Sequence, residues 1–350
     1  MAFGREGQGG VARMPAGRPA ERVDGAAPRP LAIGLVNSMP GEALRHTERQ
    51  FRGILAGAAG SIPVELRLFS FDGALPAGAH YHPVGRLAAA GIDGLIVTGM
   101  PPRAAALRDE PLWGPLANLV EFAVDRAIPT VWSCLAAHAA VLHLDGIERR
   151  RLPEKLSGLV DCTRADSGHA LAAGLPERWR LPHSRYNELP TDALAAHGYR
   201  LLSRSGDAGA DLFVKDTAAP FLFCQGHPEY DAHALLREYH RDIRQFLSGG
   251  RDDYPAAPRG CFGREVTARL EAFRRQAERD RAPDAIAGFP MAACQADMTH
   301  GWRDLALGLY ANWLAQVADR AARRPAAEAA ARADRFARPA GPAAARAAAR

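Results

Sequence analysis

The sequence predicts an α/β protein with a mostly parallel sheet and helices on both faces. Two observations support this fold class: the apolar runs from residue 31 onwards are short, and they alternate with segments of helical periodicity. Such alternation is typical of parallel strands joined by covering helices. Residues 31–320 contain no linker-like stretch, so we expect one α/β domain there, with a helical C-terminal part.

The elements follow from these patterns in chain order. The first four apolar runs predict strands at residues 31–36, 64–70, 94–98 and 130–133. Helical periodicity between and after them predicts helices at about 47–58, at 112–126 and from Cys134 onwards. Three later runs, separated by turns, predict a meander returning to the sheet at 199–203, 212–215 and 221–224. Helical patterns then resume at 235–247, 266–277 and 302–318.

The two ends of the chain differ in composition from its middle. Residues 1–30 are rich in Arg, Gly and Pro, residues 321–350 in Ala and Arg, and both are expected to be disordered. These tails carry formal charges of +2 and +5 out of a net +5, which leaves −2 for residues 31–320. The net charge therefore indicates no specific nucleic-acid partner, although a salt-sensitive contact between the C-terminal arm and a polyanion stays open.

Cysteine usage and hydropathy indicate the compartment. The five cysteines are scattered, with no Cys-x-x-Cys pair, which argues against a disulfide framework and against structural zinc. No apolar stretch approaches the roughly 18 to 20 residues that span a bilayer, and the N-terminus lacks the apolar segment of a signal peptide. We expect a cytoplasmic protein with no membrane partner; an Arg-rich transit peptide is the alternative.

Cys134 stands where an apolar run meets a helical segment. A thiol on a sharp strand-to-helix turn lies near the unpaired N–H groups of the helix, which favour the thiolate. The backbone N–H of Leu135 and the turn at Gly99 and Met100 are candidate donors to an oxyanion, because glycine lets the backbone approach closely. The alternative is a buried and inert cysteine.

A histidine and a carboxylate stand two residues apart at His227 and Glu229, with a proline between them. Proline holds an extended bend in which both side chains project to the same side. The carboxylate can then fix the tautomer of the imidazole, as acyl transfer by a cysteine requires. The alternative is a solvated turn, with Asp231 as the cap of the following helix.

Short motifs follow one another along the chain: Asn-Ser-Met-Pro at 37–40, Thr-Glu-Arg-Gln-Phe at 47–51, Asp-Gly-Leu-Ile-Val-Thr-Gly at 93–99, Glu-Lys-Leu-Ser-Gly at 154–158, Pro-His-Ser-Arg-Tyr at 182–186 and Gly-His-Pro-Glu-Tyr-Asp at 226–231. In this order they resemble the homoserine O-succinyltransferases of methionine biosynthesis. Residues 299–302 and 312–314 resemble the C-terminal helix of that family. The resemblance implies a flavodoxin-like, class I glutamine amidotransferase-like fold.

The resemblance also implies residue roles. Cys134 would form the acyl-thioester, His227 would accept the proton, and Glu229 would orient the imidazole. Three further positions match those where the family binds substrate: Lys155, Ser184 and Arg241. From the residues alone, Lys155 also fits an exposed loop lysine, and Arg241 a surface ion pair with Glu238 or Asp242.

The sequence departs from the family pattern in three places. The nucleophile segment is Trp-Ser-Cys-Leu-Ala-Ala-His at 132–138, where Cys-Trp-Ala is expected, and the loop at Met39 and Pro40 lacks an expected lysine. Arg103 occupies the loop position where the family carries glycine for succinyl donors and glutamate for acetyl donors. A cation can pair with the free carboxylate of a succinyl group, so we expect succinyl-CoA rather than acetyl-CoA.

The predicted function is acyl transfer from acyl-CoA to L-homoserine, two small-molecule substrates, with no metal or redox cofactor. Three rivals stay open: an amide hydrolase of the glutamine amidotransferase type, an acyltransferase for a related hydroxy amino acid such as serine, and a catalytically silent subunit. A homodimer, and a role for the helices after Cys261 as a cover of the site or as an interface, also stay open.

Overall fold

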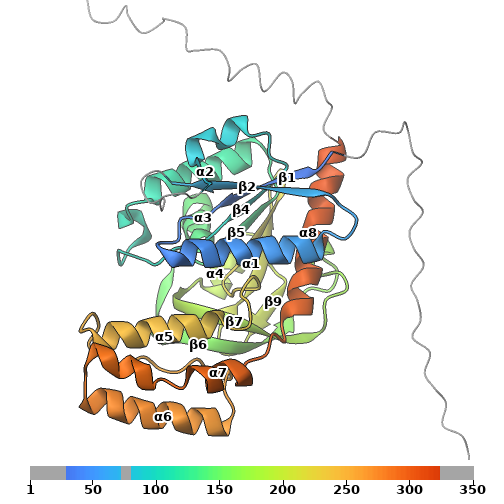
Figure 1. Cartoon of the computed structure of the whole chain (residues 1–350). Coiled ribbons are helices and arrows are strands. Elements are labelled where there is room, and N and C mark those ends of the chain that lie inside the picture. The colour runs from blue at the N-terminus through green and yellow to red at the C-terminus, as the bar shows by residue number, and fades with distance from the viewer. Residues whose placement is uncertain (1–28, 72–79, 324–350) are drawn as a thin grey trace, which may run out of the picture.

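A computed structural model describes residues 29–71 and 80–323 of the chain. Most of the two tails expected to be disordered, 1–30 and 321–350, lies outside these residues. Within them, eight strands form a central sheet in the order β3-β2-β1-β4-β5-β12-β11-β8 (Figure 1). Their bounds are β1 (Leu31–Val36), β2 (Val64–Ser70), β3 (His82–Pro83), β4 (Gly94–Val97), β5 (Thr130–Ser133), β8 (Arg200–Leu201), β11 (Leu212–Asp216) and β12 (Pro220–Cys224).

The central sheet is mostly parallel. Strands β3, β2, β1, β4, β5 and β12 run parallel to their neighbours, whereas β11 is antiparallel to both β12 and β8. This confirms the predicted fold class, and the run β8-β11-β12 confirms the predicted meander. The bounds of β1, β2 and β5 agree with the predicted strands. Strands β1 and β5 are buried throughout, and β2 is buried over its last three residues.

Helices cover both faces of this sheet. Helices α1 (Glu42–Ala58) and α8 (Arg303–Arg323) pack over one face, against the side chains of Ile33 and Val131. Helices α2 (Trp113–Asp125) and α3 (Leu135–Asp145) pack over the other, against Leu95 and Trp132. Neighbouring strand residues thus enter opposite cores, as the two-residue period of a strand requires. Helix α1 begins five residues before the predicted start, after a glycine at φ 56°.

A second sheet was not predicted. Among the described residues it has four strands in the order β10-β9-β6-β7, and its two long members pair as an antiparallel ribbon. Its bounds are β6 (Arg150–Arg164), β7 (Arg178–Glu188), β9 (Ser203–Ser205) and β10 (Gly209–Ala210). The remaining short elements are α4 (Thr191–Ala196), η1 (Val84–Ala89), η2 (Leu107–Asp109), η3 (Ala170–Ala172) and η4 (Pro283–Gly288).

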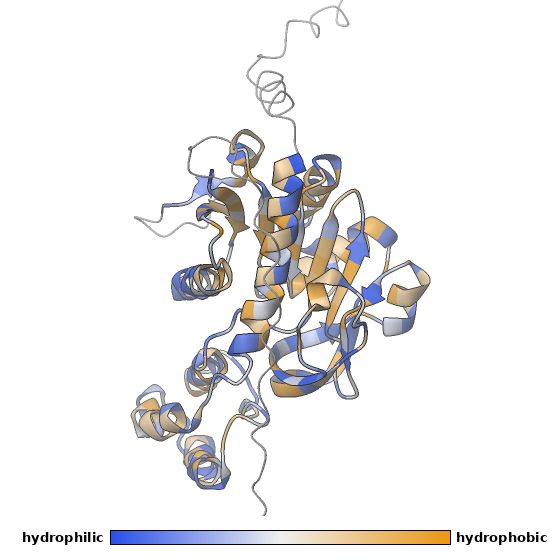
Figure 2. Cartoon of the chain, turned by 90° about the vertical axis from the view of Figure 1, so that its right-hand side faces the viewer, coloured by the Kyte–Doolittle hydropathy of each residue, from blue (hydrophilic) through white to orange (hydrophobic). Residues whose placement is uncertain are grey.

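Three helices form a separate group beside the sheets (Figures 1 and 2). They are α5 (Ala234–Leu247), α6 (Arg264–Arg279) and α7 (Met291–Asp297). They share an apolar core that includes Ile243, Leu270 and Phe273. This core is separate from the two cores on the faces of the central sheet, whose strands are mostly hydrophobic in Figure 2. No helix in the described part of the chain is long and apolar enough to cross a bilayer.

Candidate active site

Cys134 lies at the sharp turn between β5 and α3. Its backbone has φ 52° and ψ −116°, a conformation that is costly for any residue other than glycine. The N–H of Cys134 donates to the carbonyl of Cys224 at the end of β12, over 2.8 Å. The strained turn is therefore anchored between two neighbouring strands. It presents the sulfur beyond the carboxyl edge of the sheet, where open α/β sheets bind their ligands.

His227 and Glu229 form a buried pair just after β12. The Nδ1 of His227 lies 2.9 Å from a carboxylate oxygen of Glu229, and Ser133 donates its hydroxyl to the same oxygen over 3.3 Å. Burial opposes a charged imidazole, but the Glu229 carboxylate and a hydrogen bond with Cys134 raise the pKa of His227 well above its ordinary value. The imidazole therefore lies between a carboxylate and the sulfur, as a proton carrier requires.

The segment after His227 is fixed from two sides. The ring of Tyr230 stacks on the imidazole with centroids 4.1 Å apart. The indole N–H of Trp302, the residue before α8, donates to the carbonyl of Tyr230 over 2.8 Å. The last helix of the described chain thus holds the loop that carries the histidine.

Gly99 packs directly against the turn that carries Cys134. A Cβ at Gly99 would lie 3.0 Å from the backbone nitrogen of Leu135 and 3.1 Å from the Cβ of Cys134. The backbone after β4 and the start of α3 therefore converge beside the sulfur, and Met100 and Leu135 line the same space. This is the arrangement expected of two backbone donors to an oxyanion.

Gly99→Ala is expected to lower kcat by about tenfold while the protein stays folded, because the new methyl group displaces the Cys134 turn by a few tenths of an ångström. Steady-state rates and thermal unfolding of the variant measure both effects. The matched control is Gly114→Ala in α2, where a Cβ meets nothing within 4 Å. A Gly99→Ala enzyme as fast as the control would contradict the role given to this contact.

A cavity of about 590 Å³ joins these groups. It is lined by every residue predicted for the site except one: Gly99, Met100, Cys134, Leu135, Lys155, Ser184, His227, Glu229 and Arg241. The exception is Arg103, whose side chain is exposed and whose backbone N–H binds the Glu110 carboxylate. Among the described residues none beyond Arg251 lines the cavity. Of the helices after Cys261, α6 and α7 pack on α5, and α8 packs on the central sheet.

The wall formed by α5 and β6 carries balanced charges. Lys155 lies 2.9 Å from Asp242 and 3.8 Å from Glu238, and Arg241 binds Asp242 at 2.7 Å. The ion pair anticipated for Arg241 is present, in a residue that also faces the cavity. Ser184 and Tyr230 both donate hydroxyl hydrogen bonds to Glu238. This wall offers positive and negative groups side by side, which suits a zwitterionic ligand.

Sequence reasoning missed several polar residues that line the cavity, among them His138, Arg149 and Arg185, and it named Glu238 only as a possible ion-pair partner of Arg241. His138 lies one helical turn after Cys134, and this spacing alone was a usable signal. Arg185 stands next to Ser184 in a motif already singled out. For Arg149 the sequence carried no local signal.

His138 is buried and uncharged. Burial, and then the positive charge of Arg185, lowers its pKa to about 3, while a hydrogen bond to Gln225 partly opposes this. The unfolded chain takes up a proton near pH 6.5 that the folded chain refuses until about pH 3. This histidine therefore contributes its full stability above pH 6.5 and loses it as the pH falls towards 3.

His138→Gln is expected to flatten the loss of stability in acid, because the variant has no proton to take up at this position. At pH 5 the wild-type histidine costs about 2 kcal/mol relative to pH 8. Denaturant unfolding at a series of pH values measures the slope. His80→Gln, which alters an exposed histidine, is the control. Parallel curves for wild type and His138→Gln would contradict the assignment.

One group of side chains in the described chain has the composition of a metal site: Cys162, His183 and Asp211. It is fully packed, because Gly226 lies so close that a Cβ there would be 2.8 Å from both His183 and Asp211. Asp211 also accepts a hydrogen bond from Ser203 over 2.7 Å. The Nε2 of His183 lies 3.2 Å from the other carboxylate oxygen of Asp211, so the two side chains pair with each other.

Together, the parallel sheet, the strained turn at Cys134 and the buried His227–Glu229 pair define a class, that of α/β proteins with a cysteine on a strand-to-helix turn beside a histidine and a carboxylate. The chain belongs to the homoserine O-succinyltransferase family, whose family model matches residues 18–323. It is 50% identical over 302 residues to a homoserine O-succinyltransferase of Methylorubrum extorquens, covering 84% of this chain and 89% of that protein. It is 44% identical over 300 residues to one from Rhodopseudomonas palustris, covering 84% and 90%.

A solved structure of a glutamine amidotransferase from Methylobacillus flagellatus is a distant relative in shape. It shares 21% sequence identity and a TM-score of 0.47, over 82% of this chain and 94% of that one. The strand order of the central sheet, and not this likeness, defines the fold class.

Proposed function

We propose that the chain transfers a succinyl group from succinyl-CoA to the hydroxyl of L-homoserine, through a thioester on Cys134. One observation carries the mechanism: the sulfur, the His227–Glu229 pair and a charge-balanced wall face a single cavity of about 590 Å³. Membership of the family supports the choice of substrates. Five free thiols fit the cytoplasm as the place of the reaction.

In the first half-reaction the sulfur of Cys134 attacks the carbonyl carbon of the acyl-CoA thioester. The bond to the CoA sulfur breaks, and His227 gives its proton to the departing thiolate. The backbone N–H groups of Leu135 and Met100 stabilise the oxyanion that forms between the two steps. The raised pKa of His227 supports this order, because it favours an imidazole that carries the proton the departing thiolate needs.

In the second half-reaction homoserine binds at the wall between β6 and α5. Arg241 pairs with its carboxylate, Glu238 accepts its ammonium group, and Ser184 supplies a further polar contact. His227, now neutral, removes the hydroxyl proton as the oxygen attacks the enzyme thioester. O-Succinyl-homoserine leaves, and Cys134 is free again. The proposal needs acyl-CoA as co-substrate and no metal or redox cofactor.

The test separates the two halves. Intact-protein mass spectrometry of the enzyme mixed with succinyl-CoA alone is expected to show one succinyl adduct on Cys134. Adding homoserine is expected to discharge it as O-succinyl-homoserine, and serine to discharge it more slowly, because one methylene changes binding by about 1–3 kcal/mol. Absence of the adduct, or ammonia release from glutamine at comparable rates, would overturn the proposal.

A further inference from the structure

Two arginines at the cavity have no acidic partner. In the described part of the chain, neither Arg149 nor Arg185 has an ion pair within 4 Å, although both line the cavity. The other three cations at the cavity, Lys155, Arg241 and Arg251, lie within 4 Å of Asp242. The cavity is therefore lined by three cations that face carboxylates and by two further cations, Arg149 and Arg185, that face none in the described chain.

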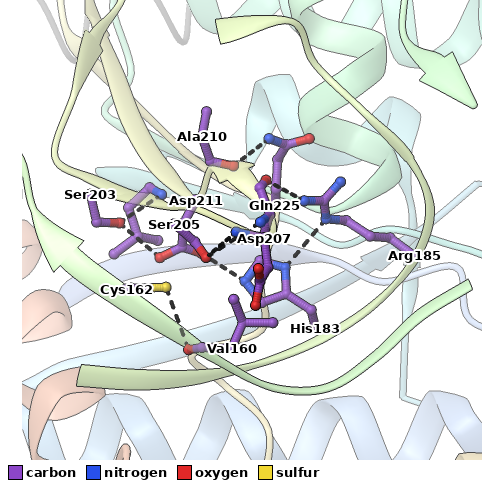
Figure 3. A network of polar contacts seen from close by, with 12 residues as sticks. Val160, Cys162, His183, Arg185, Ser203, Ser205, Asp207, Ala210, Asp211 and Gln225 are labelled. Carbon is purple, nitrogen blue, oxygen red and sulfur yellow. Dashed lines mark hydrogen bonds and ion pairs between the residues drawn. The ribbon is translucent and has the colours of Figure 1, made fainter. Parts of the chain in front are cut away.

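Arg185 is 4% exposed and held rigidly. Its guanidinium donates to the carbonyls of Asn187 and Ala208, each over 2.6 Å. Its Nε donates to the Nδ1 of His183 over 3.3 Å (Figure 3). Three of its five N–H groups are used in this way, so two remain for a ligand. Burial lowers the pKa of Arg185, and the charge of the Cys134 sulfur opposes this, so the two groups are close enough to interact.

The buried network behind Arg185 explains its position. Because the Nδ1 of His183 accepts from Arg185, its proton lies on Nε2, which is 3.2 Å from Asp211. Burial lowers the pKa of His183, so a neutral imidazole stands between the Asp211 anion and the Arg185 cation. Figure 3 shows this row of side chains. The Asp211 carboxylate is thus separated from Arg185 by the His183 side chain, and the Arg185 guanidinium can bind a ligand in the cavity.

Arg149 is the second of the two cations. It is half-buried and donates to the carbonyls of Ala104 and Ala105, over 3.2 and 3.0 Å, while its Nε is buried without a partner in the described chain. Glu110 attracts it, but the Glu110 carboxylate is engaged by the backbone N–H groups of Arg103 and Ala104. His138, whose pKa is lowered by burial and by both arginines, is uncharged. Two partly desolvated cations with free donors favour an anionic ligand.

We propose that Arg149 and Arg185 bind the terminal carboxylate of the acyl group and thereby select a dicarboxylic donor over a monocarboxylic one. The inference rests on the proposed function and deepens it. Three carbon–carbon bonds separate the reacting carbonyl carbon of a succinyl group from its carboxylate carbon. A carboxylate there lies within reach of groups beside Cys134, and the bidentate geometry of guanidinium suits it. Arg149 and Arg185 thus have the role in binding the succinyl carboxylate that was predicted from the sequence for Arg103.

The test compares succinyl-CoA with butyryl-CoA, which has the same chain length and no terminal charge. The ratio of the two kcat/KM values for Cys134 acylation is expected to fall roughly 10- to 100-fold in Arg149→Gln and in Arg185→Gln. Arg185→Lys is expected to lie between wild type and Arg185→Gln. The ratio is independent of the folded fraction, so it stays informative if loss of Arg185 weakens the fold. Arg108→Gln removes an exposed arginine outside the cavity and is the control.

Each outcome decides between specific readings. Equal losses with both donors would overturn the proposal and make the arginines general activators of the sulfur or binders of the CoA moiety. An unchanged ratio in both Arg→Gln variants would overturn it outright. Failure of the proposed function looks different, because wild-type enzyme would then form no adduct with either donor.

Discussion

Cys134→Ala is expected to lower kcat for acyl transfer by about 10⁴-fold or more, and to remove the succinyl adduct altogether. Loss of a nucleophile is the largest effect available to a single substitution, because no other group can form the covalent intermediate. The backbone conformation at Cys134 indicates that the effect comes from loss of the sulfur and not from a change in the turn. A residue held at φ 52° is maintained against strain, so alanine there keeps the turn and removes only the sulfur.

The control for this variant is Cys294→Ala. Cys294 is buried in the core shared by α5, α6 and α7 and does not line the cavity. Its loss is expected to cost some stability and leave the rate per folded molecule unchanged. A Cys134→Ala enzyme that keeps more than about a hundredth of wild-type turnover would remove the thioester from the mechanism.

Glu229→Gln is expected to lower kcat by about 10³-fold with little change in fold. The two side chains have the same shape, but an amide cannot compensate the charged imidazole, and it permits the wrong tautomer. Both donors to Oε1, the imidazole and the Ser133 hydroxyl, then compete for a weaker acceptor. Pre-steady-state acylation rates are the direct measurement, with Glu271→Gln on the exposed face of α6 as control.

The pH dependence gives this variant a second readout. Glu229 raises the pKa of His227, so removing its charge moves the protonation of the imidazole to lower pH. In wild type, the stability contributed by the charged pair is present below the ordinary histidine pKa and lost as pH rises through the higher folded value. Glu229→Gln should lose this alkaline dependence. An unshifted pH–rate profile would indicate that the carboxylate does not act on the imidazole.

The part of the fold that could be predicted is the part whose strands are buried on both faces. Strands β1 and β5 are continuous apolar runs, so their bounds followed from composition. Strand β6 is exposed on alternate residues, and Gly158 interrupts its apolar positions because the backbone of Arg259 packs where a side chain would stand. Close contact with a distant segment leaves no pattern in the local sequence.

The candidate site divides in the same way. The pairing of His227 with Glu229 was predictable because the two residues are two positions apart, and the turn at Cys134 because an apolar strand pattern there meets a helical one. The charge balance of the cavity was not, since it depends on which arginine meets which carboxylate across the fold. Arg103 shows the difference: counting residues placed it near the acyl group, but the backbone contact with Glu110 leaves its side chain outside.

The hydrogen bond from Trp302 to Tyr230 has a consequence for biosynthesis. Cys134 is synthesised before the middle of the chain, yet the loop that contains His227 and Tyr230 is held by Trp302, 168 positions after Cys134. A nascent chain whose last helix is still inside the ribosomal exit tunnel lacks the hydrogen bond from Trp302 to Tyr230. A chain that terminates upstream of Trp302 is therefore expected to contain Cys134, His227 and Glu229 but to lack the hydrogen bond that holds the segment at Tyr230.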